Sequence, residues 1–202
     1  MNNNIEHYVF HKENFLDEKY CENSIDKLDK CTWKKHEWYY PQEDYPLFLS
    51  GDNEPENISP EMFSNDVHKI NDFIIQELRS SIKEYIKKLK FESESALTFD
   101  WFDGWEGYSS MKFIRYFPDQ KMQIHCDHIH SIFDGERKGI PILSIIGLLN
   151  DDFEGGELIM FEDKKIDIKK GDLIIFPSNF LYPHEITPVT KGVRYSYTSW
   201  VW

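Results

Sequence analysis

The feature that most restricts the fold of this chain is a series of short strand-like segments after residue 108. Each segment is rich in β-branched, aliphatic and aromatic residues, and turn sequences such as DDFEGG, KKGD and PSN separate them. Short strands at this spacing are typical of two packed sheets, either a sandwich or a jelly roll. The segments are MKFIRYF, PILSIIGLL, ELIMF, KIDI, DLIIFP and VRYSYTSWVW.

The first half of the chain carries a long helical signal. Ser59-Pro60-Glu61 offers a helix N-cap, a proline at the first helical position and an acidic first turn. Apolar residues then recur every three or four positions, which predicts a long amphipathic helix near residues 60–90 that packs against a sheet. The apolar positions are Phe63, Val67, Ile70, Ile74, Leu78, Ile82, Ile86 and Leu89.

The other segments of the first half are shorter. We expect a strand at residues 5–10 (IEHYVF), a short helix around residues 14–28, and ordered loop over residues 35–58. A length of 202 residues fits one domain. The expected fold class is α+β with a mainly β core, in which residues 108–202 form the jelly roll and residues 1–98 form a helical flanking part.

The charge and the cysteine content limit which binding partners and which cellular compartment are expected. The chain has 23 basic and 36 acidic residues, a net charge of -13. A phosphate backbone or an anionic membrane would repel such a surface, so we expect neither nucleic acid nor a membrane as partner. Cys21, Cys31 and Cys126 lack CxxC spacing, and the N-terminus lacks the apolar stretch of a signal peptide. The expected compartment is the cytoplasm.

Three residues have the chemistry of a metal site. His125 and Asp127 are separated by one residue, so on a strand their side chains would share one face. His184 follows the strand-like DLIIFP, and in a jelly roll distant strands face each other across the interior. Two imidazoles and one carboxylate leave positions open on the metal, which suits Fe(II) that must also bind a cosubstrate and dioxygen. A structural zinc site would require four protein ligands.

Arg194 lies ten residues after His184, within a strand-like segment. A permanently charged guanidinium inside a β-barrel needs a carboxylate partner, because burying it unpaired is costly. That carboxylate could belong to a ligand whose other end chelates the metal, or to another protein side chain. Tyr116 and Ser144 could add a phenol and a hydroxyl to the same ligand, although an ordinary core tyrosine and an ordinary strand serine remain alternatives.

Several ordered motifs resemble a known family. RYFPDQKMQIHCD, LLNDDFEGGEL and KKGDLIIFPSNFLYPHEITPVTKGVRYSYTSW are similar to the prolyl 4-hydroxylase branch of the 2-oxoglutarate- and Fe(II)-dependent oxygenases, over about residues 108–202. The resemblance implies a double-stranded β-helix (jelly roll) with N-terminal flanking helices. It implies that Fe(II) is bound by His125, Asp127 and His184. It also implies that the cosubstrate 2-oxoglutarate is bound by Arg194, Tyr116 and Ser144.

The resemblance also points to the substrate. Trp200 matches a tryptophan that lies close to the substrate, and strand alternation places it on one face with Arg194, Ser196 and Thr198. Met122 departs from the pattern, because the family often has a tyrosine there, near the bound proline. This departure concerns the position near the bound proline and leaves the implied iron and cosubstrate residues unchanged.

The implied function is an Fe(II)- and 2-oxoglutarate-dependent dioxygenase that uses O2, releases succinate and CO2, and has ascorbate as a further cofactor. The favoured substrate is a prolyl residue of a protein or peptide, and the enzyme would be a monomer or a homodimer. One alternative is a hydroxylase of a free amino acid or other small metabolite, and another is a non-enzymatic jelly-roll binding or sensing domain. Residues 128–140 are expected to form a lid or an ordinary surface loop, and their histidines His128 and His130 offer a competing ligand register.

Overall fold

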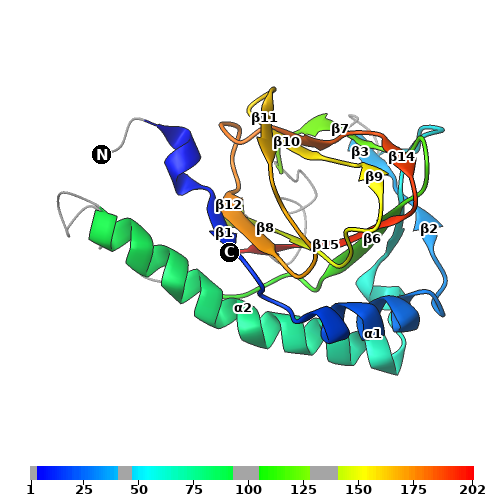
Figure 1. Ribbon diagram of the computed structural model, residues 1–202, viewed down its shortest axis with the longest axis horizontal. Helices are drawn as coiled ribbons and strands as arrows, with labels where there is room; N and C mark the ends of the chain where they lie inside the picture. The colour runs from blue at the N-terminus through cyan, green and yellow to red at the C-terminus, as the bar shows by residue number, and fades with distance from the viewer. Residues whose placement is uncertain (1–3, 41–46, 93–104, 128–140) are drawn as a thin grey trace.

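The computed structural model describes residues 4–40, 47–92, 105–127 and 141–202 (Figure 1). Most strands lie in two antiparallel sheets. The larger has seven strands in the order β1-β12-β8-β15-β6-β5-β2, and the smaller has four in the order β11-β10-β13-β7. Two short ribbons, β14-β9 and β3-β4, complete the strands of the described ranges.

The bounds of the elements are as follows. The larger sheet contains β1 (Phe10–Lys12), β2 (Lys34–Lys35), β5 (Glu56–Ile58), β6 (Lys112–Tyr116), β8 (Leu143–Leu148), β12 (Leu173–Pro177) and β15 (Arg194–Val201). The smaller sheet contains β7 (Met122–His125), β10 (Leu158–Met160), β11 (Lys164–Ile166) and β13 (His184–Ile186). The ribbons contain β3 (Trp38–Tyr40), β4 (Leu47–Leu49), β9 (Glu154–Gly155) and β14 (Val189–Lys191). The helices are η1 (Ile5–Tyr8), α1 (Glu18–Leu28), η2 (Pro60–Met62) and α2 (Asn65–Glu92), of which η1 and η2 are 3-10 helices.

The larger sheet is buried on both faces at β8 and β12, which explains the mainly apolar sequences of these two strands. Leu143 and Ile145 of β8 pack into the core that contains the helices, whereas Ile146 packs with Ile174 of β12 into the core between the two sheets. Figure 1 shows α1 and α2 side by side below the larger sheet, with the smaller sheet on its other side. Two packed sheets with helices against one of them confirm the prediction of a double-stranded β-helix with flanking helices.

The long helix α2 lies where the apolar periodicity placed it, but its start was predicted wrongly. Ser59 and Pro60 open the short helix η2, and α2 begins only at Asn65. The side chain of Ser64 accepts a hydrogen bond from the backbone N–H of Val67 (3.3 Å), which is the position of a helix N-cap. The predicted stripe is buried along the helix at Val67, Ile70, Ile74, Leu78, Ile82 and Leu89.

Two further predictions for the first half were wrong. Residues 5–8 form a 3-10 helix, and the strand begins only at Phe10, where β1 pairs with β12. Residues 35–58 were expected to be loop, but they contribute strands to the larger sheet, since β5 pairs with β6. The short helix α1 was correctly expected, and the carboxylate of Asp17 caps it by accepting a hydrogen bond from the backbone N–H of Tyr20 (2.7 Å).

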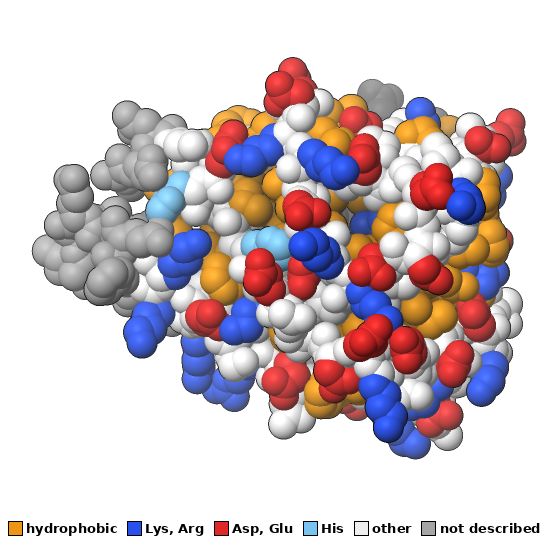
Figure 2. All heavy atoms as spheres, in the orientation of Figure 1, with side chains coloured by type: hydrophobic (Ala, Val, Ile, Leu, Met, Phe, Trp, Pro, Cys, Tyr) orange, Lys and Arg blue, Asp and Glu red, His pale blue; other side chains and the backbone are white. Residues whose placement is uncertain are grey.

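The surface shows how the acidic charge is distributed. On the face in Figure 2, acidic and basic side chains are mixed, and apolar side chains lie between them. Within the described ranges, no helix has both the length and the apolar character needed to cross a bilayer.

Candidate metal centre

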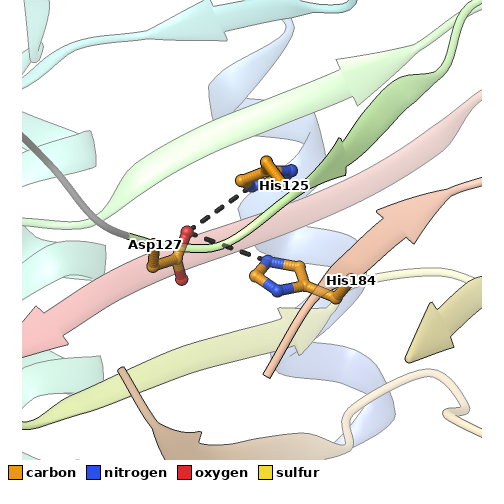
Figure 3. A group of neighbouring side chains, drawn as sticks. All are labelled: His125, Asp127 and His184. Atoms are coloured by element: carbon orange, nitrogen blue, oxygen red, sulfur yellow. Dashed lines mark ion pairs between the residues drawn. The ribbon is translucent and has the colours of Figure 1, made fainter. Parts of the chain in front are cut away.

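The structure brings His125, Asp127 and His184 together at one end of the smaller sheet (Figure 3). One potential ligand atom of each residue lies within 4.8 Å of those of the other two. Oδ1 of Asp127 lies 3.5 Å from Nε2 of His125 and 3.7 Å from Nε2 of His184. Such a cluster can hold one metal ion on a single face and leave its other positions open.

Two details of the predicted geometry were wrong. His184 does not face His125 across the interior, because it opens β13, which pairs with β7 in the same sheet, and the two histidines are direct cross-strand partners. Asp127 is not on the strand, since β7 ends at His125. Cross-strand pairing brings the two histidines together, and Asp127 follows two residues after the end of β7, so the three side chains converge without sharing one strand face.

Hydrogen bonds to the backbone fix how the two imidazoles point. Nδ1–H of His125 donates to the carbonyl of Gln123 (2.8 Å), and Nδ1–H of His184 donates to the carbonyl of Tyr182 (3.1 Å). With Nδ1 used in this way, Nε2 of each ring carries the free lone pair and points toward Asp127. The ring orientation and the tautomer therefore both suit metal binding.

The protonation states also suit a metal. Burial by itself would raise the pKa of Asp127, but His184 first, then His125 and Ser144, lower this pKa well below its usual value. Burial lowers the pKa of His184, against the opposing effect of Asp127. An ionised carboxylate beside a neutral imidazole is the state in which these side chains bind a cation, so little proton release is needed at neutral pH.

Two serines form a hydrogen-bonded chain that ends at the backbone of Asp127. Ser144 on β8 is fully buried and donates to the hydroxyl of Ser178 (2.9 Å), which in turn donates to the backbone carbonyl of Asp127 (3.3 Å). Ser144 therefore lies next to the cluster, as the resemblance required of a residue in the site. Ser178 was not predicted, and a serine after a strand gives no sequence signal by itself.

Arg194 is buried with most of its hydrogen-bonding capacity unused. It is 1% exposed, and Nη1 donates to Ser196 (2.8 Å), while Nε and Nη2 have no hydrogen-bond partner in the described part of the chain. Its guanidinium lies 5.1 Å from the ring centre of Tyr116 and 6.0 Å from that of Phe153. Among the described residues no carboxylate pairs with it. Burial lowers the pKa of Arg194, although a guanidinium stays charged in proteins.

Tyr116 and Arg194 are cross-strand partners on β6 and β15. The side chain of Tyr116 is 2% exposed, and burial raises its pKa to about 12, against the lowering effect of Arg194, so the phenol remains a hydrogen-bond donor.

Gly156 was missed by sequence reasoning as a residue that shapes the site around Arg194. It has a φ of +61°, and a Cβ at this position would lie 3.0 Å from Cδ of Arg194. Glycine therefore leaves room for the arginine side chain.

The two residues expected near the substrate lie in different surroundings. Trp200 is the cross-strand partner of Ser144, and its indole N–H is buried without an acceptor in the described ranges. Met122 is 6% exposed, is opposite Ile186, and packs in the core between the sheets. The segment 128–140, expected to form a lid or a surface loop, lies outside the described residues.

Other residues near the cluster were missed by sequence reasoning. Trp38 packs edge-on against His125, with ring centres 5.2 Å apart, and His36 packs against Trp38 at 4.9 Å. Lys112 places Nζ 2.9 Å from Nδ1 of His36. The alternation of β6 could have found Lys112, because it lies four residues before Tyr116 and so on the same face. His36 and Trp38 lie in the segment that was read as loop.

Comparison with known proteins finds the family that the sequence motifs resemble. Residues 111–202 match the model of the 2OG-Fe(II) oxygenase superfamily. A PKHD-type hydroxylase of Idiomarina loihiensis is 33% identical over 90 residues, which cover 43% of this chain and 39% of the relative. The chain thus matches well under half the length of that curated relative.

The fold is shared with solved structures over nearly the whole chain. The viral collagen prolyl hydroxylase of Paramecium bursaria Chlorella virus-1, in a 2OG complex, has a TM-score of 0.57 at 15% identity and covers 96% of this chain and 94% of its own. A Trichoplax adhaerens prolyl hydroxylase, in complex with a hypoxia inducible factor oxygen degradation domain peptide fragment, has a TM-score of 0.66 at 16% identity, covering 97% and 84%. Residues 111–202 are therefore similar to the 2OG-Fe(II) oxygenase superfamily, and the described chain shares its fold with solved prolyl hydroxylases.

Proposed function

We propose that this protein is an Fe(II)- and 2-oxoglutarate-dependent dioxygenase that hydroxylates prolyl residues of a protein or peptide. The observation that carries the proposal is the buried guanidinium of Arg194, which has two unused nitrogen atoms and no carboxylate partner among the described residues. An acid whose other end chelates a metal at His125, Asp127 and His184 would supply that partner. 2-Oxoglutarate has this form, and the superfamily is defined by its use.

Each residue then has a role. Fe(II) would be held by Nε2 of His125, Nε2 of His184 and a carboxylate oxygen of Asp127. Arg194 binds the far carboxylate of 2-oxoglutarate with a planar fork, and the phenol of Tyr116 lies against the same guanidinium. When bound, Fe(II) with 2-oxoglutarate and O2 supplies the oxidation that inserts one oxygen atom into a C–H bond and releases succinate and CO2.

Other residues orient these groups and the substrate. The hydroxyl of Ser144 is assigned to the cosubstrate pocket, and its bond to Ser178 also links it to Asp127. The aromatic ring of Trp200 and the thioether of Met122 are assigned to the substrate side. Asp127 and His184 are buried, which strengthens the charge interactions between them.

The prolyl substrate is supported by the named activity of the solved structures with this fold, and hydroxylation by the name of the relative. We further propose that residues 1–202 act as one oxygenase domain, that ascorbate maintains the ferrous state, and that the protein works in the cytoplasm as a monomer or homodimer. The second candidate is hydroxylation of a free amino acid with the same metal and cosubstrate. Lys112 favours it, because its ammonium group would pair with the carboxylate of such a substrate.

The test is a reaction of the purified protein with Fe(II), 2-oxoglutarate, O2 and ascorbate on proline-rich peptides. A gain of one oxygen atom on proline, matched by succinate, is expected, and H184A should remove both signals. Absence of metal-dependent 2-oxoglutarate binding would overturn the oxygenase proposal and favour a non-enzymatic binding domain. Binding without any peptide oxidation would overturn only the prolyl substrate.

A further inference from the structure

Lys112 is a second cation on the strand that carries Tyr116. Strand alternation places Lys112, Ile114 and Tyr116 on one face of β6, and Ile114 and Tyr116 lie in the core between the sheets. Across the sheet Lys112 pairs with Thr198, whereas Tyr116 pairs with Arg194. Four residues of strand separate the two positions by about 13 Å. Arg194 and Lys112 therefore supply positive charge at opposite ends of the same inner face.

The surroundings of Lys112 leave its charge without a partner carboxylate. Nζ donates to Nδ1 of His36 at 2.9 Å, and no carboxylate of the described residues lies within ion-pair distance of it. Burial, and then the charge of Lys112, lower the pKa of His36 to about 3, so this imidazole is neutral and accepts the bond. Burial lowers the pKa of Lys112 to about 8, while Asp127 acts in the opposite direction. The lysine is thus mainly charged at neutral pH, and an ammonium group has three donors.

Lys112 is linked to the metal centre through two aromatic side chains. His36 contacts Trp38, and Trp38 contacts His125, with ring centres 4.9 Å and 5.2 Å apart. Asp127 is close enough to Lys112 to affect its pKa. The indole N–H groups of Trp38 and Trp200 are both buried without an acceptor in the described ranges. Trp38 and Trp200 therefore present donors whose acceptor the described residues do not provide.

Donors of this kind select an anionic acceptor. Removing an ammonium group from water costs free energy, and a single neutral hydrogen-bond partner offsets only part of this cost. A carboxylate offsets more of it through charge-assisted hydrogen bonds. The cosubstrate carboxylate is assigned to Arg194 at the far end of the face. Since no carboxylate of the described residues pairs with Lys112, we assign a second carboxylate at this position to the molecule that is oxidised.

We propose that Lys112, with the indole N–H groups of Trp38 and Trp200, binds a carboxylate of the substrate beside the metal centre. The inference rests on the proposed function, since it names the substrate class for that site. The carboxylate has two possible sources. It is the α-carboxylate of a free amino acid, or it is the side chain of an Asp or Glu next to the target residue in a peptide.

The test measures binding without turnover. The protein is loaded with Mn(II) and 2-oxoglutarate in the absence of O2, and probes are titrated by calorimetry. L-Proline is compared with L-prolinamide, and a blocked peptide with the sequence Ala-Pro-Glu is compared with Ala-Pro-Gln. We expect one carboxylate probe to bind at least about tenfold more tightly than its amide, which identifies the source. K112M should remove this preference, and K112R should retain most of it.

Two controls separate this inference from the function on which it rests. K83M removes an exposed lysine on α2 and should keep the preference. Titration of 2-oxoglutarate into the Mn(II) protein tests the proposed function by itself, and K112M should leave that affinity within about twofold. If wild-type protein does not distinguish carboxylate from amide in either pair, the inference is overturned. If K112M mainly weakens metal or 2-oxoglutarate binding, Lys112 instead balances Asp127 or the chelating group, which also overturns it.

Discussion

His125 and His184 are opposed across two neighbouring antiparallel strands, and their imidazole ring centres lie 4.4 Å apart. Cross-strand pairing sets this spacing through the backbone rather than through flexible side chains. Because Gln123 and Tyr182 also accept hydrogen bonds from both rings, the protein itself orients the two imidazoles. Preorganised ligands of this kind make the effects of single substitutions predictable.

Removing one of the cross-strand pair should abolish tight metal binding. H184A leaves one imidazole and one carboxylate, so we expect a loss of affinity for Fe(II) or Mn(II) larger than the roughly 10- to 100-fold that loss of an outer-shell partner causes. Titration of the metal by calorimetry or by electron paramagnetic resonance of Mn(II) measures this loss. H68A, which alters an exposed histidine on α2, serves as the matched control. Equal affinity in the two variants would rule out His184 as a ligand.

Arg194 should have opposite effects on cosubstrate binding and on the stability of the free protein. R194M removes one partner of a buried charge pair, so 2-oxoglutarate affinity should fall at least about 30-fold, from roughly 2 kcal/mol or more. The same change replaces a buried, partly unsatisfied charge with an apolar chain, so the free energy of unfolding without cosubstrate should rise by about 1 kcal/mol or more. Titrations and urea denaturation measure the two quantities. A fall in stability would show that Arg194 has a protein partner.

Gly147 should be intolerant of any side chain. A Cβ at this position would lie 2.0 Å from Cζ of Tyr197, its cross-strand partner. Overpacking of this kind typically costs about 1–3 kcal/mol, and we expect G147A at or above the upper end of that range. Adding Y197L should recover part of the loss, because the aromatic ring is what collides. Urea denaturation of the single and double variants tests this, and additive effects would contradict it.

His36 should make the protein sensitive to mild acid. Its pKa is lowered to about 3 in the folded state, first by burial and then by Lys112, whereas an unfolded histidine titrates near about 6.5. Between these values the unfolded chain binds more protons, so the free energy of unfolding is retained above about pH 6.5 and falls as the pH drops toward 3. H36Q keeps a neutral acceptor without titrating. Its slope of stability against pH should be shallower by up to about 1.4 kcal/mol per pH unit. Parallel slopes in metal-free protein would contradict the prediction.

Much of the second half could be predicted from local patterns. The runs at β8 and β12 are mainly apolar because both faces of the larger sheet are covered there. The periodicity of α2 likewise identified its buried face. Helix and strand periods are local properties, so they can be read from the sequence without knowing the contacts.

The short elements could not be predicted in this way. η1, β2 and β5 have few residues, and β5 forms because the edge of β6 is available for pairing. Their signals are too weak to favour one local conformation, and tertiary pairing decides the outcome. This explains why His36 and Trp38 were missed, since they lie in that segment.

The sequence alone determined which side chains can hold a metal and which cation can bind a carboxylate, because those roles depend on chemical type and on motif spacing. Only the tertiary structure decided that His125 and His184 are neighbours in one sheet, that Arg194 is left without a carboxylate in the described residues, and that Lys112 lies beside Asp127's cluster. Strand order and burial are set by contacts between residues distant in sequence, and these contacts determine the free-energy cost of each buried charge.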